Sequence, residues 1–305
     1  MDVSVIIVNY NTKELLKNCL NSIYKQTKDI EFEVIVSDNG SVDGSIEMVN
    51  TSFPQVILIE NNANLGFGTA NNRGLKVAKG KYISYLNSDT ILLNNAIKYF
   101  FDYWENSTEK EKIGALGCNL VDENMKITHS YEKFPDCDKI IKNLVRANYG
   151  LMKEFFLQIF KNKKKQELIQ KKNIEKKIGE VDYICGADLF LLNNDFALFD
   201  EKIFLYVEEV DLQYRLMKNE KKRLLIDGPL IIHLEGKASK KNKTQPFPTI
   251  TNFSSRCNNI SLVYYFRKNI SRYKAFLVKV GILFLWLNPL VINFTKKSIL
   301  DLIRR

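Results

Sequence analysis

The sequence predicts an α/β protein in which helices flank a largely parallel central sheet. Short apolar runs alternate with amphipathic segments over residues 3–89. Strands that alternate with helices in this way form parallel sheets, because each helix returns the chain to the start of the next strand. Apolar residues make up 45% of the 305 residues, which suffices for the core of one large domain or two smaller ones.

Four strands are expected in this region, in the segments "VSVIIVNYN", "FEVIVSDNGS", "VILIE" and "KYISYLNSD". Thr12 can cap the helix after the first strand, and Ser41 or Asp43 the helix after the second. A third helix is expected to end at Gly80, a residue type that often terminates helices.

Each of these strands is followed by polar residues, namely Asn9-Tyr10-Asn11, Asp38-Asn39-Gly40, 61–64 and Asn87-Ser88-Asp89. Ligands of α/β sheets bind where the carboxyl ends of the strands meet. The sequence therefore predicts a binding site at this edge.

The second half of the chain is organised differently. Residues 136–180 are helical in pattern and rich in lysine, which indicates either a solvated helical insertion or a basic helix that touches acidic lipid. Strand patterns return at 181–192 and 223–234, a Lys-, Asn- and Pro-rich loop covers 237–249, and the remainder is helical. We expect one domain over 1–249, with 136–180 inserted in it, and a helical region over 250–305.

The two parts of the chain also differ in net charge. Residues 1–140 hold 14 Lys and Arg against 19 Asp and Glu, a net −5, whereas 141–305 hold 31 against 16, a net +15.

Residues 275–292 are the most apolar stretch, but Lys279 and Asn288-Pro289 interrupt it. This stretch fits helices at a membrane surface better than core packing or a spanning helix. No base-stacking basic motif accompanies the charge, so a nucleic-acid partner is not expected.

The cysteines point to a reducing compartment. There are five, an odd number, and no two form a C-x-x-C pair, which argues against a zinc ribbon or a disulfide framework. The apolar run after Asp2 is too short for a signal peptide. A cytoplasmic protein is expected.

Single residues at the predicted edge each carry two interpretations. Asp38 can accept from a base or ribose, or can simply hold a turn. Tyr10 can stack on a base or be a rim aromatic. Asp89 can bind a hard metal ion or cap a helix. His233, one of two histidines, can be a second metal ligand or a core residue. "GFGTANNRG" is not a dinucleotide fingerprint, because Asn71 replaces its third glycine.

Three acids in "LYVEEVDLQYRL" form the clearest catalytic candidate. On a helix, Glu208 and Asp211 share a face, and Glu209 points about 100° away from Glu208. Burial and like charges raise the pKa of a carboxylic acid, which makes it a better general base. The alternative is an ordinary charged helix start.

Taken in order, these segments resemble family 2 glycosyltransferases of the GT-A fold, in the branch with bacterial rhamnosyltransferases. "NLGFGTANNRG", "YLNSD", "GADLFLL" and "FDEKIFLYVEEVDLQYRL…IDGPLIIH" carry the resemblance together with the strands above, over about residues 2–235. The resemblance implies that Glu209 is the catalytic base, and the helix spacing lets Glu208 and Asp211 bind or orient while Glu209 faces the reacting hydroxyl. It also implies that Mg²⁺ or Mn²⁺ binds Asp89 and His233, although Asn87 stands where the family's D-x-D motif has its first Asp. Nucleotide contacts are implied for Tyr10, Asn11, Asp38, Asn64, Gly66, Asn72, Asn87 and Ser88, and a sugar pocket for Gly186, Ala187 and Asp188.

The implied reaction is an inverting transfer of rhamnose or a similar hexose from a dTDP- or UDP-sugar. The acceptor would be a hydroxyl of a glycan or lipid-linked intermediate in cell-surface polysaccharide synthesis, on the inner face of the plasma membrane. The alternatives are a catalytically inactive sugar-nucleotide binding module and a nucleotidyltransferase. The latter would need a Gly- and Arg-rich loop after the first strand, where Asn9-Tyr10-Asn11 stands.

Overall fold

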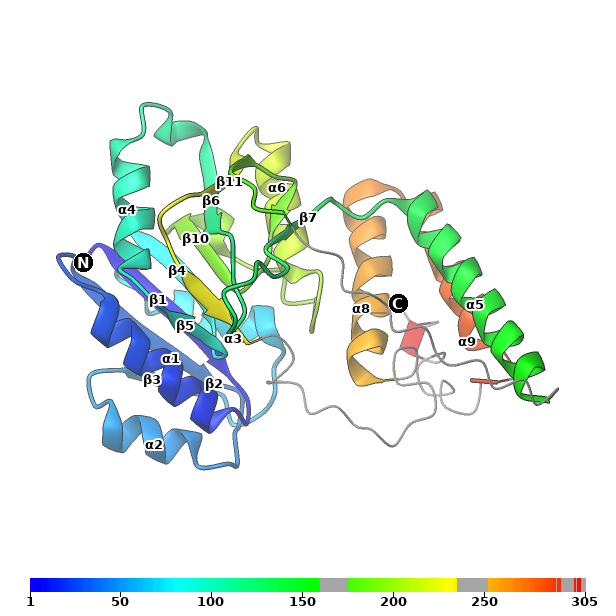
Figure 1. Ribbon diagram of the computed structural model, residues 1–305, viewed down its shortest axis with the longest axis horizontal. Coiled ribbons are helices and arrows are strands. Elements are labelled where there is room, and N and C mark those ends of the chain that lie inside the picture. The colour runs from blue at the N-terminus through cyan, green and yellow to red at the C-terminus, as the bar shows by residue number, and fades with distance from the viewer. Residues whose placement is uncertain (160–174, 235–251, 289, 292–298, 300, 303–305) are drawn as a thin grey trace. The chain divides into compact units, whose positions relative to one another are not determined.

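The computed structural model describes residues 1–159, 175–234, 252–288, 290, 291, 299, 301 and 302, and the side chains of 154–159 are not described. Its residues group into two compact units (Figure 1). Among the described residues, the first unit holds 1–134, 175–204 and 208–234, and the second holds 135–159, 205–207 and those from 252 onward. The expected loop at 237–249 lies outside the described residues.

The first unit is built on an eight-stranded sheet. Its order is β3 (Ile57–Glu60), β2 (Phe32–Asp38), β1 (Val3–Asn9), β4 (Tyr82–Asn87), β10 (Asp188–Leu192), β6 (Ile113–Cys118), β11 (Lys222–Ile226) and β8 (Gly179–Glu180). The four predicted strands run parallel to one another, which confirms the expected fold class. Among the later strands, β10 is antiparallel to both of its neighbours, a direction that no local sequence pattern indicates.

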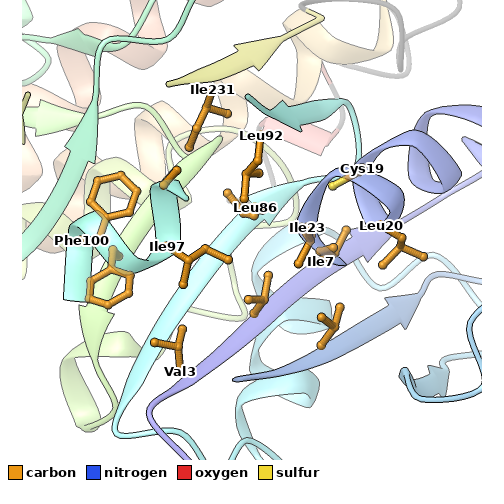
Figure 2. Packing of buried hydrophobic residues seen from close by; sticks show 14 of the residues in the cluster. Val3, Ile7, Cys19, Leu20, Ile23, Leu86, Leu92, Ile97, Phe100 and Ile231 are labelled. Atoms are coloured by element: carbon orange, nitrogen blue, oxygen red, sulfur yellow. The ribbon is translucent and has the colours of Figure 1, made fainter. Parts of the chain in front are cut away.

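Helices cover both faces of this sheet. They are α1 (Lys13–Gln26), α2 (Ser45–Ser52), α3 (Phe67–Leu75), α4 (Ala96–Asn106) and α6 (Glu208–Lys218). Alternate residues of β1 enter two separate cores, because successive side chains of a strand point to opposite faces. Val3 and Ile7 pack with α1 and α4 (Figure 2), whereas Ile6 packs on the face that α6 covers.

One predicted helix cap and one predicted helix end differ from the structure. Thr12 makes no capping bond to α1, and its hydroxyl donates instead to Asn9 Oδ1 at 2.6 Å. The third helix ends at Leu75 rather than Gly80. Gly80 is needed for a close approach: a Cβ there would overlap the backbone nitrogen of Ser4.

The second unit is helical. It contains α5 (Cys137–Ile159), α8 (Phe253–Tyr265), a π-helical turn at Phe266–Ile270 and α9 (Arg272–Trp286). Asn148 of α5 donates to the Phe284 carbonyl of α9 at 3.2 Å. The described part of the Lys-rich segment therefore packs with the C-terminal helices, while the predicted division at 249 stays a prediction. No helix within the described ranges is long and apolar enough to cross a bilayer.

Candidate active site

Sheet register brings the polar strand ends together. Asn9 lies opposite Asp38, Asp38 opposite Glu60, and Val8 opposite Asn87, so that β1, β2, β3 and β4 end along one edge. This edge is the binding site that the sequence predicts for a sheet of this kind.

Asp38 is buried and anchors the loop that follows it. Asn9 Nδ2 donates to Asp38 Oδ2 at 2.7 Å, and the Ser41 amide donates to Asp38 Oδ1 at 2.7 Å. Both carboxylate oxygens thus have partners inside the protein. This geometry supports the turn-holding interpretation, and a direct contact to a nucleotide stays a prediction.

Tyr10 and Asn11 lie beside this anchor. Asn11 has a left-handed backbone (φ 54°), and its Oδ1 accepts from the Val42 amide at 2.8 Å. The Tyr10 ring is exposed at the end of β1. An exposed ring at this edge is available for stacking, as the predicted base contact requires.

The predicted residues around α3 have different surroundings. Asn64 Oδ1 accepts from the Gly66 amide at 3.1 Å, and Gly66 itself (φ 88°) lies so close to the Phe204 carbonyl that a Cβ would overlap it. Asn72 is buried, and its amide group both donates to and accepts from the Phe199 backbone at 2.9 Å. Asn72 therefore fastens α3 to the segment at 199, which gives it a structural role.

Asp89 and His233 form the candidate metal site. The short strands β5 (Thr90–Leu92) and β12 (Ile231–His233) pair with Thr90 opposite His233. This pairing places His233 Nε2 3.4 Å from Asp89 Oδ1, and 3.5 Å from Asn87 Nδ2. These residues, distant in the sequence, thus lie side by side, and their role as metal ligands stays a prediction. Ser88 turns away, with its hydroxyl 2.9 Å from that of Thr12.

The donor set fits a divalent cation that completes its shell with substrate oxygens. One carboxylate and one imidazole are both buried here, and hard cations commonly combine few protein ligands with phosphate oxygens and water. In the described parts of the chain, no three His, Cys, Asp or Glu side chains cluster in a way that could hold a metal ion.

The three acids lie at the start of α6, directly after two residues with left-handed backbone, Tyr206 (φ 65°) and Val207 (φ 73°). Such a conformation is unfavourable for a β-branched residue and marks strained sites. Glu208 and Asp211 are buried, as their shared face predicts, and Glu209 is only partly buried.

The two adjacent glutamates have raised pKa values. Burial raises the pKa of Glu208 well above its ordinary value, and the Glu209 charge adds to the effect. No hydrogen bond reaches Glu208 Oε2 from the residues that the structure describes. Burial also raises the pKa of Glu209. A partly exposed carboxylate with a raised pKa suits a general base.

The predicted sugar-pocket residues connect the acids of α6 to the candidate metal site at Asp89 and His233. A Cβ on Gly186 would lie 3.4 Å from Glu209 Cβ and 3.7 Å from its carboxyl carbon. Ala187 O accepts from the Asn87 amide at 3.1 Å, so this segment touches both halves of the site. Asp188 differs from its neighbours. It is buried, accepts from the Cys118 amide at 2.7 Å, and has its pKa raised by burial to about 7.

The sequence did not reveal the residues that position these groups. Gln213 bonds both the amide and the carbonyl of Ile184, each at 2.8 Å, and thereby fixes α6 against strand β9 (Tyr183–Ile184). Arg215 of the same helix donates to the carbonyls of Phe196 and Leu198. Asn9 was among the polar residues at the strand ends, but the sequence pattern did not indicate that its side chain bonds to Asp38.

Comparisons with known proteins show what the chain as a whole is similar to. The family model described as "Glycosyl transferase family 2" matches residues 4–148. The chain is 30% identical over 220 residues to "UDP-Glc:alpha-D-GlcNAc-diphosphoundecaprenol beta-1,3-glucosyltransferase WfaP" of Escherichia coli, covering 58% of this chain and 86% of the relative. It is 29% identical over 170 residues to the "Poly(ribitol-phosphate) beta-glucosyltransferase" of Bacillus spizizenii, covering 54% and 26%. The chain thus spans only about a quarter of that protein's length.

Solved structures show the same fold at low identity. A mannosyltransferase from Pyrobaculum calidifontis, in complex with GDP-Man and Mn²⁺, has a TM-score of 0.54 at 14% identity, covering 97% of this chain and 73% of its own. Staphylococcus aureus TarS has a TM-score of 0.52 at 16% identity, covering 100% and 54%.

Proposed function

Because this chain belongs to glycosyltransferase family 2 and has the GT-A fold, we propose that it transfers a hexosyl group from a nucleotide-diphosphate sugar to a hydroxyl group of a glycan or lipid-linked acceptor. The observation that carries the proposal is the position of Glu209. It lies against Gly186, one residue from Ala187, whose carbonyl bonds Asn87 beside the Asp89–His233 pair. This series of contacts links the proposed base to the proposed diphosphate site and supports their use on one substrate.

The reaction we propose is a single displacement with inversion. Glu209 takes the proton of the acceptor hydroxyl, whose oxygen forms a bond to the anomeric carbon. The bond from that carbon to the nucleotide diphosphate breaks, and the diphosphate leaves with the electron pair. We assign a supporting role to buried Glu208 and Asp211, since both lie on the first turn of α6 with Glu209.

Asp89 and His233 would hold a divalent metal, with Mg²⁺ and Mn²⁺ both chemically suited. Bound there, the metal would neutralise charge on the diphosphate. Tyr10 would stack on the nucleotide base, and Asn11, Asn64 and Gly66 would shape the loops around it.

The donor is proposed to be a UDP- or dTDP-hexose. A dTDP-rhamnose donor follows from the resemblance to rhamnosyltransferases, whereas the names of two relatives specify glucosyl transfer, one of them from UDP-glucose. The same relative's name specifies a diphosphoundecaprenol-linked acceptor, which supports a lipid-linked acceptor for this chain in polysaccharide synthesis.

We also place the protein at the inner surface of the plasma membrane. On α9, Tyr273, Phe276, Val280 and Phe284 are all exposed and recur every three or four residues, so they form one apolar face. Residues 141–305 carry a net charge of +15. An exposed aromatic face on a basic unit suits binding to an anionic bilayer.

The test is a thermal-shift panel of UDP-, dTDP- and GDP-sugars with and without Mn²⁺ or Mg²⁺, combined with transfer assays on Glu209→Gln. A ligand that binds only the native state raises the melting temperature. We expect one nucleotide to give a metal-dependent shift in both proteins, and Glu209→Gln to lose transfer at least a hundredfold. Binding without turnover by the wild-type chain would indicate an inactive binding module, and no shift with any donor would refute the proposal.

A further inference from the structure

A surface groove of about 490 Å³ runs between α4 and the end of β11, within the first unit. Ligand sites commonly have volumes of this order. None of the candidate active-site residues lines it. The groove is therefore separate from the predicted nucleotide and acceptor sites, and its lining has a chemistry of its own.

Two tyrosines provide its aromatic wall. Tyr99 and Tyr103 lie one turn apart on α4 and remain 47% and 43% exposed. Both are among the lining residues. Rings one turn apart on a helix project from the same face and can contact one extended ligand.

The Tyr99 ring is held in position. It rests against Gly228 (φ 110°), where a Cβ would lie 3.0 Å from Tyr99 Cδ1. Asn94 fixes this loop, because its Nδ2 donates to the Gly228 carbonyl at 2.7 Å and its Oδ1 accepts from the Leu230 amide at 3.0 Å. The Tyr99 part of the aromatic wall is thus preorganised.

Polar groups with complementary roles line the rest of the groove. Asp102 is paired with Lys98 at 2.7 Å, and Asp227 with Lys176 at 2.8 Å, so both carboxylates are fixed as acceptors. Lys176 also holds the pKa of Asp227 below its ordinary value. The side chains of Asn106 and Thr108 make no hydrogen bond to any other described residue, which leaves donors and acceptors for a ligand.

We propose that this groove binds a carbohydrate chain. A sugar ring has apolar C–H faces that pack on aromatic rings and hydroxyls that donate to carboxylates, and the groove offers both kinds of surface. Phosphate and other anions are disfavoured because the described lining residues include no lysine or arginine to bind them. An apolar peptide is disfavoured because the aliphatic part of the lining is the nearly buried Ile226.

The inference rests on the proposed function for one point, which is that the bound chain is part of the growing acceptor glycan. A second site on the acceptor would hold the chain while its terminal hydroxyl reacts elsewhere on the enzyme. It would raise the effective concentration of longer acceptors without touching the reacting atoms.

The experiment measures binding of maltohexaose, cellohexaose and chitohexaose by saturation-transfer NMR and titration calorimetry. We expect at least one of them to bind, and Tyr103→Ala to weaken it about tenfold, as expected for losing one aromatic contact. Tyr103→Phe keeps the ring and is expected to bind within about twofold of wild type. Tyr149→Ala is the matched control, because Tyr149 is 72% exposed but belongs to α5.

Two results would overturn the inference: no binding of any of the three hexasaccharides, or equal binding by wild type and Tyr103→Ala with unchanged melting temperatures. Failure of the proposed function is recognised separately. It would appear as a missing nucleotide-dependent thermal shift in the wild-type chain, a measurement that Tyr103→Ala is expected to leave unchanged.

Discussion

Gly186 and Glu209 are in direct contact distance: a methyl group on Gly186 would lie between 3.4 and 3.7 Å from three carbons of the Glu209 side chain. The absence of a side chain at 186 therefore leaves the space beside the candidate base. An acceptor hydroxyl must approach that carboxylate closely for proton transfer.

A larger residue at position 186 is expected to disturb the base. Gly186→Leu should lower the rate of transfer by about a hundredfold, because displacements of about 1 Å have effects of this size. Nucleotide binding should not change. The control is Gly150→Ala, since nothing lies within 4 Å of a Cβ there. Wild-type transfer by Gly186→Leu would mean that the base lies elsewhere.

The pH dependence of transfer should reflect the Glu209 environment. Burial favours the protonated acid and raises its pKa, and only the deprotonated form can accept a proton. We expect kcat/KM to fall as pH decreases through a midpoint above the ordinary glutamate value of about 4.3. Glu208→Gln should retain this acidic limb. A profile without any acidic limb down to pH 4.5 would count against Glu209 as the base.

Metal-dependent binding should require both members of the Asp89–His233 pair. Asp89→Ala and His233→Ala are each expected to abolish the difference between thermal shifts measured with Mn²⁺ and with EDTA. Glu47→Ala, which removes an exposed acid on α2, should retain it. An undiminished metal effect in either variant would refute the assignment of that ligand.

Asp188 should make folding stability depend on pH. Its pKa is about 7 in the native protein and about 4 in an unfolded chain, so the native state binds the proton more tightly. As the pH rises between these two pKa values, the free energy of unfolding should therefore decrease by about 1.4 kcal/mol per pH unit. Asp188→Asn, which keeps an acceptor for the Cys118 amide, should lack this component. Urea titrations at pH 4.5, 5.5 and 6.5 measure it, and parallel curves for the two proteins would contradict it.

The apolar face of α9 should mediate binding to vesicles. Phe276→Ala with Phe284→Ala is expected to lower partitioning onto phosphatidylglycerol-containing vesicles at least tenfold, because two large apolar side chains are removed. Val42→Ala, at an exposed apolar residue of the first unit, is the control. Co-sedimentation measures both, and equal partitioning of all three proteins would exclude this face.

The sequence predicted the parts of the fold that depend on local pattern. Alternating strands and helices identified the parallel β1–β4 region, and polar strand ends identified the binding edge. The partnership of Asp89 with His233 came from family resemblance, because the two residues are 144 positions apart and no local rule connects them. The sequence could not predict that β10 runs antiparallel or that α5 packs with α9, because such pairings are decided by tertiary contacts. The bond from Asn9 to Asp38 depends on exact register between strands.

The antiparallel strand β10 also determines when the central sheet can be completed during synthesis. It separates β4 from β6 in the sheet, yet residues 188–192 are made after both. Until they emerge from the ribosome, β4 and β6 each present an unpaired edge, and such edges favour aggregation. We therefore expect a nascent chain that stops before residue 188 to depend on chaperones, because its sheet cannot close.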